Sequence, residues 1–138
     1  MIIRITIGVL LSAALTASVH AQSFDGTYTG TRTLTKITRT GQGTPNCPPV
    51  GRKTPVVFTV ANSTITAFSP EENIRSSGSL ASDGSFTITY GAGFWGGGPG
   101  SGTIPVTWSG RIRGSRIQAN FIVRGPAGDC IGTFSARK

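Results

Sequence analysis

Apolar and polar residues alternate along most of the chain with the period of β-strands. From Ile104 to Val123 the alternation continues on both sides of Gly114-Ser115. If these two residues form a tight turn, Trp108 faces Phe121, and the large apolar residues other than Ile122 share one face. A shift of one residue would move one strand's apolar set to the other face, so pattern and turn independently predict the same register.

Two more hairpins are predicted upstream. Residues 55–69 form one across Asn62-Ser63, and residues 74–90 form another through Ser82-Asp83-Gly84, with Gly84 in the left-handed conformation. The cross-strand pairs that these turns predict are Val60 with Ile65, Phe58 with Ala67, Leu80 with Phe86, and Gly78 with Ile88.

The remaining segments complete a series of eight strands. Phe24 to Lys36 is the first strand, with Tyr28, Arg32 and Leu34 on one face, and Asp129 to Arg137 is the last. No segment after residue 21 has a convincing helical period. Because an antiparallel meander hides its apolar face and its edges by closing, we predict an all-β, up-and-down, eight-stranded barrel in which the last strand pairs with the first. A two-sheet β-sandwich is the alternative.

The first 21 residues have the features of a secretory signal peptide. Arg4 precedes an apolar run from Ile5 to Leu15, and small residues, Val19 and Ala21, stand before the predicted cleavage site. The segment is too short and too weakly flanked to predict a membrane span. We therefore expect export to the periplasm or the extracellular space and a single domain from residue 22 to 138, with a folded N-terminal helix as the alternative.

The two cysteines, Cys47 and Cys130, are expected to form a disulfide in an oxidising compartment. The closed loop of about 84 residues would stabilise the fold by roughly 4–5 kcal/mol in the chain-entropy model. The only histidine, His20, leaves with the signal peptide, and two thiols alone make a poor zinc site, so no metal is expected.

The charge of the chain favours anionic partners. The sequence has 13 basic and 5 acidic residues, a formal net charge of +8, and cleavage would remove Arg4 and leave +7. Nucleic acid is not expected, because the basic residues are scattered and no recognition motif is present. Solubility of an exported protein is the alternative explanation of the charge.

Catalysis is not expected from these residues. The predicted mature chain has no histidine and no free thiol, and few carboxylates. Asp83 is predicted in a turn, and Glu71 and Glu72 in a solvated turn. We therefore predict a protein that is not an enzyme and has no cofactor.

Binding within the barrel is the first functional hypothesis. Large aromatic side chains alternate with glycine and alanine on the predicted inner face, which could leave a cavity for a small apolar or amphipathic ligand. Interdigitation that fills the barrel is the alternative. The predicted ligand-binding residues are Tyr28, Phe58, Phe86, Trp108 and Phe121.

Binding through the surface is the second hypothesis. Phe94 and Trp95 lie within a glycine-rich segment, Gly91 to Gly102, and are predicted to form an interaction loop, with a plug over the barrel end as the alternative. Arg111, Arg113 and Arg116 form a basic edge, which is either simply solvated or recognises an anionic envelope component or a protein partner. The protein itself is expected to be a monomer or a weak dimer.

Two short motifs resemble those of known barrels. Thr107-Trp108-Ser109-Gly110 and the opening FDGTYTG, Phe24 to Gly30, are similar to the avidin family and, more broadly, to lipocalin-like barrels. That resemblance implies an eight-stranded ligand-binding barrel in which Trp108 walls the ligand, although Gly30, Leu34 and Phe121 depart from the avidin pattern.

Two further resemblances concern exported bacterial barrels. The segment Cys130 to Phe134 together with the FDG opening resembles those of small exported barrels, many without an assigned role. The scheme also resembles periplasmic metalloprotease inhibitors, in which Gln22-Ser23-Phe24 would be the blocking segment.

Overall fold

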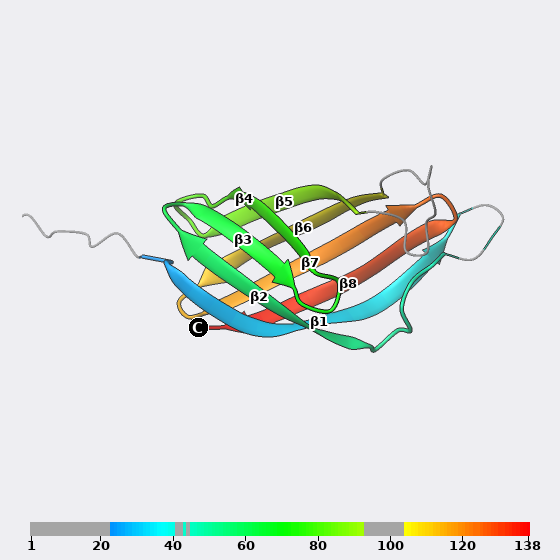
Figure 1. Cartoon of the computed structure of the whole chain (residues 1–138), viewed down its shortest axis with the longest axis horizontal. Helices are drawn as coiled ribbons and strands as arrows, with labels where there is room; N and C mark the ends of the chain where they lie inside the picture. Colours follow the sequence, from blue (N-terminus) through cyan, green and yellow to red (C-terminus); the bar gives the residue numbers. More distant parts are fainter. Residues whose placement is uncertain (1–22, 41–42, 44, 93–103) are drawn as a thin grey trace, which may run out of the picture.

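The computed structural model describes residues 23–40, 43, 45–92 and 104–138, and these form one antiparallel sheet of eight strands. Figure 1 shows the sheet curled into a nearly closed barrel, which confirms the all-β, up-and-down prediction over the sandwich. The order across the sheet is β4-β3-β2-β1-β8-β7-β6-β5. The strands are β1 (Gly26–Arg39), β2 (Lys53–Ala61), β3 (Thr64–Ser69), β4 (Ile74–Ser79), β5 (Ser85–Ala92), β6 (Ile104–Arg113), β7 (Arg116–Gly125) and β8 (Gly128–Arg137).

The hairpin between β6 and β7 has the register that its alternation predicts. Trp108 is opposite Phe121, and Gly114 turns the chain with φ of 57°. The hairpin between β2 and β3 is also confirmed, and its turn residues Asn62 and Ser63 have φ of 51° and 58°. Such positive φ values at both central positions match the right-handed twist of the flanking strands.

The first and last strands close most of the barrel. β1 pairs with β8 from Thr29 to Arg39, and one extra residue, Thr35, forms a bulge between Leu34 and Lys36. The predicted strand end at Lys36 is therefore too early, because pairing resumes after the bulge. The loop between β1 and β2 is tied to β8 by the predicted Cys47–Cys130 disulfide, which joins Cα atoms 5.6 Å apart.

The β4–β5 seam, where these strands meet, has no hydrogen-bonded ladder. Leu80 and Phe86 form an isolated bridge, while the predicted pair of Gly78 with Ile88 is not part of any strand pairing between the two strands. On its other side, the amide of Leu80 donates to the carbonyl of Ser63 at 2.8 Å, which continues the β3–β4 ladder. The third hairpin is therefore correct at its turn, where Gly84 has φ of 83°, and in the pair of Leu80 with Phe86, but its strands form no continuous ladder.

The interior is a continuous core of apolar side chains. Gly30 and Gly110 permit the close strand coiling around it, because a Cβ on Gly30 would clash with the carbonyl of Ser135 and one on Gly110 with Ala119. Phe24 packs against the core where β1 begins. No helix in the described ranges is long and apolar enough to cross a membrane.

Candidate functional site: a polar cluster in the barrel interior

The five aromatic residues predicted to bind ligand are all buried. Tyr28, Phe58 and Trp108 are 0 % exposed, Phe121 is 4 % exposed and Phe86 is 5 % exposed. The ring centroid of Phe58 lies 6.1 Å from that of Phe86 and 6.1 Å from that of Trp108, so these three side chains form one aromatic group. The rings therefore contact one another across the barrel.

Phe134 on β8 joins this group and was not predicted as a site residue. Its ring centroid lies 4.6 Å from Trp108, 5.2 Å from Phe121 and 5.7 Å from Phe58. Its period-two spacing from Cys130 and Ala136 on the last strand was the signal that places it inside. Phe134 thus fills the centre between the aromatic rings that were predicted to bind a ligand.

Tyr28 and Trp108 differ in what their polar atoms do. The hydroxyl of Tyr28 donates a hydrogen bond to the carbonyl of Phe24 at 2.8 Å, and burial followed by the nearby Asp25 raises the pKa of Tyr28. The indole Nε1 of Trp108 is buried and has no hydrogen-bond partner among the described residues. Of these two residues, Trp108 is therefore the one whose side-chain polar atom remains available to a ligand.

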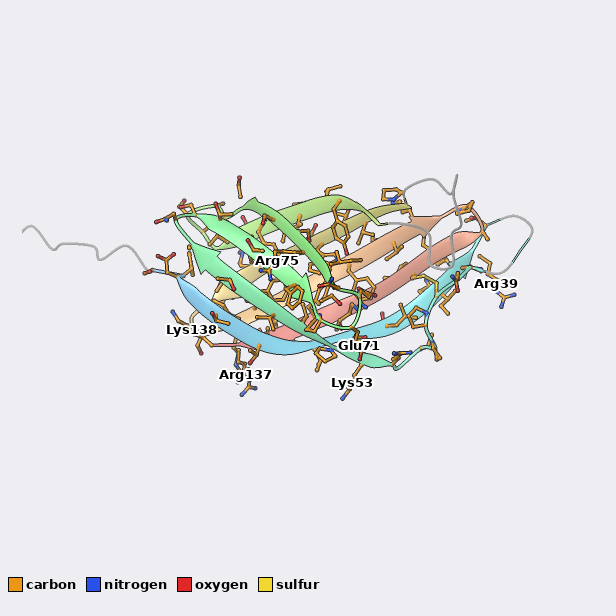
Figure 2. All side chains as sticks on the ribbon, viewed as in Figure 1. Arg39, Lys53, Glu71, Arg75, Arg137 and Lys138 are labelled. Carbon is orange, nitrogen blue, oxygen red and sulfur yellow. A yellow bond between two sulfur atoms is a disulfide. The ribbon has the colours of Figure 1, made fainter. Side chains whose placement is uncertain are left out.

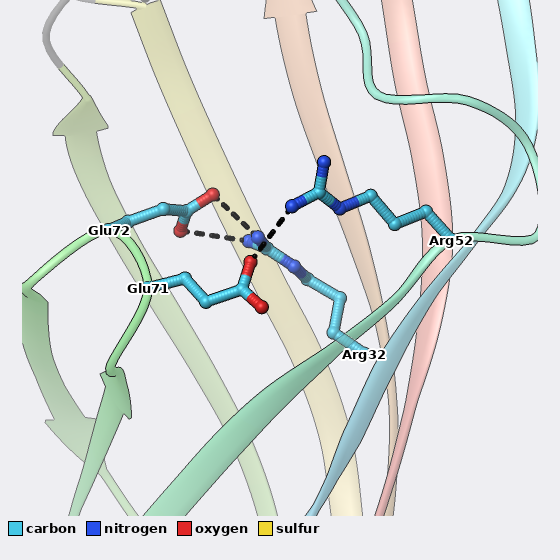
Figure 3. Close-up of polar contacts among 4 residues, drawn as sticks. All are labelled: Arg32, Arg52, Glu71 and Glu72. Carbon is cyan, nitrogen blue, oxygen red and sulfur yellow. Dashed lines mark hydrogen bonds and ion pairs between the residues drawn. The ribbon is translucent and has the colours of Figure 1, made fainter.

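Two arginine–glutamate pairs join the β3–β4 turn to β1 and to the loop before β2 (Figure 3). Arg32 donates two hydrogen bonds to Glu72, at 2.5 and 3.1 Å, and their side chains are 11 % and 14 % exposed. Arg52 contacts Glu71 at 3.2 Å, but these side chains are 54 % and 43 % exposed. The prediction of a solvated acidic turn is therefore wrong for Glu72, because Arg32 projects from the inner face of β1 and pairs with it.

Two serines of the same hairpin are buried without partners. Ser69 ends β3 and Ser76 lies on β4, and neither Oγ has a hydrogen-bond partner among the described residues. Burying a polar group without a partner costs about 1–3 kcal/mol, so such atoms are uncommon in folded proteins. Together with Trp108 Nε1, they are the buried side-chain polar atoms left unpaired in the part of the chain that the structure describes.

Tyr90 on β5 connects the ion pair to Trp108. Its ring lies edge-on to Trp108, with centroids 5.6 Å apart. Burial, with a further contribution from the Glu72 carboxylate, raises the pKa of Tyr90 to about 12, while Arg32 and the Trp108 N–H act in the opposite direction. The Trp108 N–H is near enough to affect the hydroxyl but does not reach hydrogen-bond geometry with it.

These residues define the polar cluster of the interior, which we take as the candidate site. Its members come from β1, the β3–β4 hairpin, β5 and β6, so residues that are distant in the sequence contribute to it. The polar cluster consists of Arg32, Ser69, Glu72, Ser76, Tyr90 and Trp108.

A small cavity borders the cluster on the disulfide side. Its volume is about 20 Å³, and Arg32, Leu34, Phe121 and Cys130 are among the residues that line it. A cavity of roughly 10–15 Å³ or more can hold one water molecule. The cavity is therefore large enough for one water, and a larger ligand would require the surrounding strands to move.

The other predicted sites lie elsewhere. Arg111, Arg113 and Arg116 are exposed on the outer face of β6 and β7, and Arg111 contacts Asp83 at 3.1 Å. Hydrogen bonds from Ser85, with a smaller contribution from Arg111, lower the pKa of Asp83. The predicted signal peptide and the loop residues Phe94 and Trp95 lie outside the described residues.

Comparison with known proteins adds no identity to this geometry. No family model, no curated protein and no solved structure matches the chain. The described residues also contain no group of three or more histidine, cysteine, aspartate or glutamate side chains that could hold a metal ion.

Proposed function

We propose that this protein is an exported, non-catalytic binding protein that holds a small amphipathic molecule at the polar cluster. The observation that supports the proposal is a set of three buried polar atoms, Ser69 Oγ, Ser76 Oγ and Trp108 Nε1, that have no hydrogen-bond partner within the described part of the chain. A ligand that supplies hydrogen-bond partners to these atoms would offset the cost of burying them unpaired.

The chemistry of the cluster favours a neutral polar head. Trp108 Nε1 is a donor only, and the two serine hydroxyls can donate or accept, so a carbonyl or hydroxyl group would suit all three. Arg32, the one buried cation in the described ranges, is already neutralised by Glu72. The apolar tail of the ligand would then lie against the neighbouring aromatic side chains.

The β4–β5 seam is the proposed route of entry. β4 and β5 share one isolated bridge and no ladder, so separating them breaks few backbone hydrogen bonds. Ser76 lies on β4 and Tyr90 on β5, the two strands that border this seam. Movement of β4 would therefore both admit the ligand and expose the groups that bind it.

Export is proposed on two grounds. The first 21 residues have the pattern of a secretory signal peptide, and Cys47–Cys130 is a disulfide of the kind that persists in oxidising compartments. The compartment is then the periplasm or the extracellular space, where a small barrel of this kind would act as a carrier or scavenger.

Two measurements test the function. Native mass spectrometry of the protein purified from a bacterial periplasm should detect a bound small molecule that denaturation releases. Calorimetric titration with decanol, decanoic acid and decylamine, which share one tail, should then give the tightest binding for decanol.

Matched variants locate the site. Trp108→Phe keeps an aromatic ring but removes the unpaired N–H, and should weaken decanol binding about tenfold or more. Tyr28→Phe removes a hydroxyl that is already bonded to Phe24 and should leave binding unchanged. Equal binding of all three probes, or an effect of Tyr28→Phe as large as that of Trp108→Phe, would contradict the proposal.

A further inference from the structure

The outer faces of β6, β7 and β8 present a three-by-three grid of polar side chains. The strand registers place three residues side by side at each of three levels. The levels are Arg113 with Arg116 and Arg137, Arg111 with Gln118 and Ser135, and Ser109 with Asn120 and Thr133. We call this surface the arginine grid.

The arginine grid is hollowed rather than flat. The residues of the grid other than Arg137 line most of an open depression with a volume of about 820 Å³, and Gly110, Ala119 and Phe134 are the remaining lining residues. Ala119 and Phe134 are buried and belong to the core, so the side chains available in the depression are those of the polar residues. The depression is therefore lined mainly by polar residues and lies on the outside of the barrel.

One level of the grid concentrates uncompensated positive charge. Arg116 lies opposite Arg113 on one side and opposite Arg137 on the other. None of these three has a carboxylate partner among the described residues, whereas Arg111 contacts Asp83 at 3.1 Å. Figure 2 shows Arg137 projecting outward at the end of β8, with Lys138 beside it.

This arrangement is unfavourable unless an anion is bound. Like charges directly opposite each other on neighbouring strands destabilise a sheet by tenths of a kilocalorie per mole, and the arginine grid contains two such pairs. Guanidinium groups bind carboxylate and sulfate groups through two parallel hydrogen bonds. The row of arginines is therefore suited to a ligand with several anionic groups.

The rest of the grid indicates what carries those groups. Ser109, Gln118, Asn120, Thr133 and Ser135 offer hydroxyl and amide groups, which can donate and accept hydrogen bonds with sugar hydroxyls. No exposed aromatic residue is available in the grid for stacking on bases, and none of its side chains is apolar enough for insertion into a lipid surface. From these observations we infer that the arginine grid binds an acidic polysaccharide.

This inference is independent of the proposed ligand site. The arginine grid faces outward from β6, β7 and β8, whereas the polar cluster lies within the barrel. A variant that removes charge from the grid should therefore leave decanol binding unchanged. The polysaccharide assay and the decanol assay can then fail independently of each other.

Binding should be measured with heparin, a sulfated polysaccharide, and alginate, a polyuronate, with neutral dextran as the control ligand. The test variant is Arg113→Gln/Arg116→Gln/Arg137→Gln. The control variant, Lys36→Gln/Arg39→Gln/Lys53→Gln, removes the same charge from exposed positions outside the grid. Arg39 and Lys53 project from other parts of the barrel (Figure 2).

We expect the test variant to lose about tenfold or more in affinity for both acidic polysaccharides, and the control variant about twofold. Added salt should weaken binding of the parent protein, and dextran should not bind. Equal losses in the two variants, or tighter binding to duplex DNA or to anionic vesicles than to either polysaccharide, would overturn the inference. Thermal unfolding provides the folding control, because removing opposed charges should leave the test variant at least as stable as the parent.

Discussion

Two parts of the barrel interior are built from the same alternating strands but differ in how their polar atoms are satisfied. Where β1 begins, Tyr28 is buried and its hydroxyl donates to the carbonyl of Phe24. In the polar cluster, Arg32 and Glu72 satisfy each other, while Ser76 and Trp108 have buried polar atoms without partners among the described residues. The first part is complete by itself, and the second has hydrogen-bonding capacity that a ligand could use.

The comparison teaches that burial alone does not distinguish a structural core from a binding site. Trp108 and Tyr28 are both 0 % exposed, and both lie on strands with ordinary alternation. The difference lies in the partners of the single polar atom that each carries. Experiments that change one part and use the other as control can therefore test this account.

The largest expected effect on stability comes from removing the disulfide beside the polar cluster. Cys47→Ala/Cys130→Ala removes the bond that ties the β1–β2 loop to β8. The free energy of unfolding should fall by roughly 4–5 kcal/mol, because the link closes a loop with a sequence separation of 83 residues. Chemical denaturation of the variant and of the reduced parent protein measures this loss of stability. A loss below about 1 kcal/mol in both would show that the disulfide is dispensable for stability.

The two adjacent glutamates provide the next contrast. Glu72→Ala leaves Arg32 buried without its carboxylate and should lower the free energy of unfolding by about 3 kcal/mol. Glu71→Ala removes a partner from the exposed Arg52 and should change it by less than about 1 kcal/mol. Denaturant titration of the two variants measures both changes in the free energy of unfolding.

A double variant separates the charge from the packing in this region. Arg32→Met/Glu72→Leu removes both charges while keeping apolar volume, and it should recover most of the loss caused by Glu72→Ala. Equal losses for Glu71→Ala and Glu72→Ala would show that the buried pair has no special role.

The third contrast appears at alkaline pH. The pKa of Tyr90 is raised from 10 to about 12, so below pH 10 its neutral form contributes fully to stability, and that contribution is lost as the pH rises through about 12. The loss should approach about 2 kcal/mol, because the unfolded chain ionises first.

The control for this contrast is the other tyrosine of the chain. Tyr28 also has a raised pKa, so Tyr90→Phe and Tyr28→Phe are compared by tyrosinate absorbance and by unfolding at pH 8 and above. Tyr90→Phe should remove the larger part of the alkaline loss of stability. The account of Tyr90 fails if Tyr28→Phe removes more.

Most of the fold was predictable because it depends on local alternation and turn chemistry. The register of Trp108 with Phe121 follows from a two-residue turn and a single apolar face. The missing ladder at the β4–β5 seam was not predictable from alternation, because the local pattern does not show that β4 pairs with β3, where the amide of Leu80 continues the β3–β4 ladder at the carbonyl of Ser63.

The candidate site was predictable only in part. Trp108 was found because it lies among apolar residues on an inner face, and Arg32 on the largely apolar face of the first strand was a signal that could have been used. Glu72 was not distinguishable from Glu71 in sequence, since only the three-dimensional position of Arg32 buries one and leaves the other exposed.

The most direct test of the central claim measures stability and binding together in Ser69→Ala/Ser76→Ala, with Tyr28→Phe as its counterpart. Because the two serine hydroxyls have no hydrogen-bond partners among the residues that the structure describes, the double variant should keep or slightly raise the free energy of unfolding while losing about tenfold or more in decanol affinity. Tyr28→Phe should lose about 1 kcal/mol of stability and no affinity. A double variant that loses stability but binds decanol as the parent does would contradict the account.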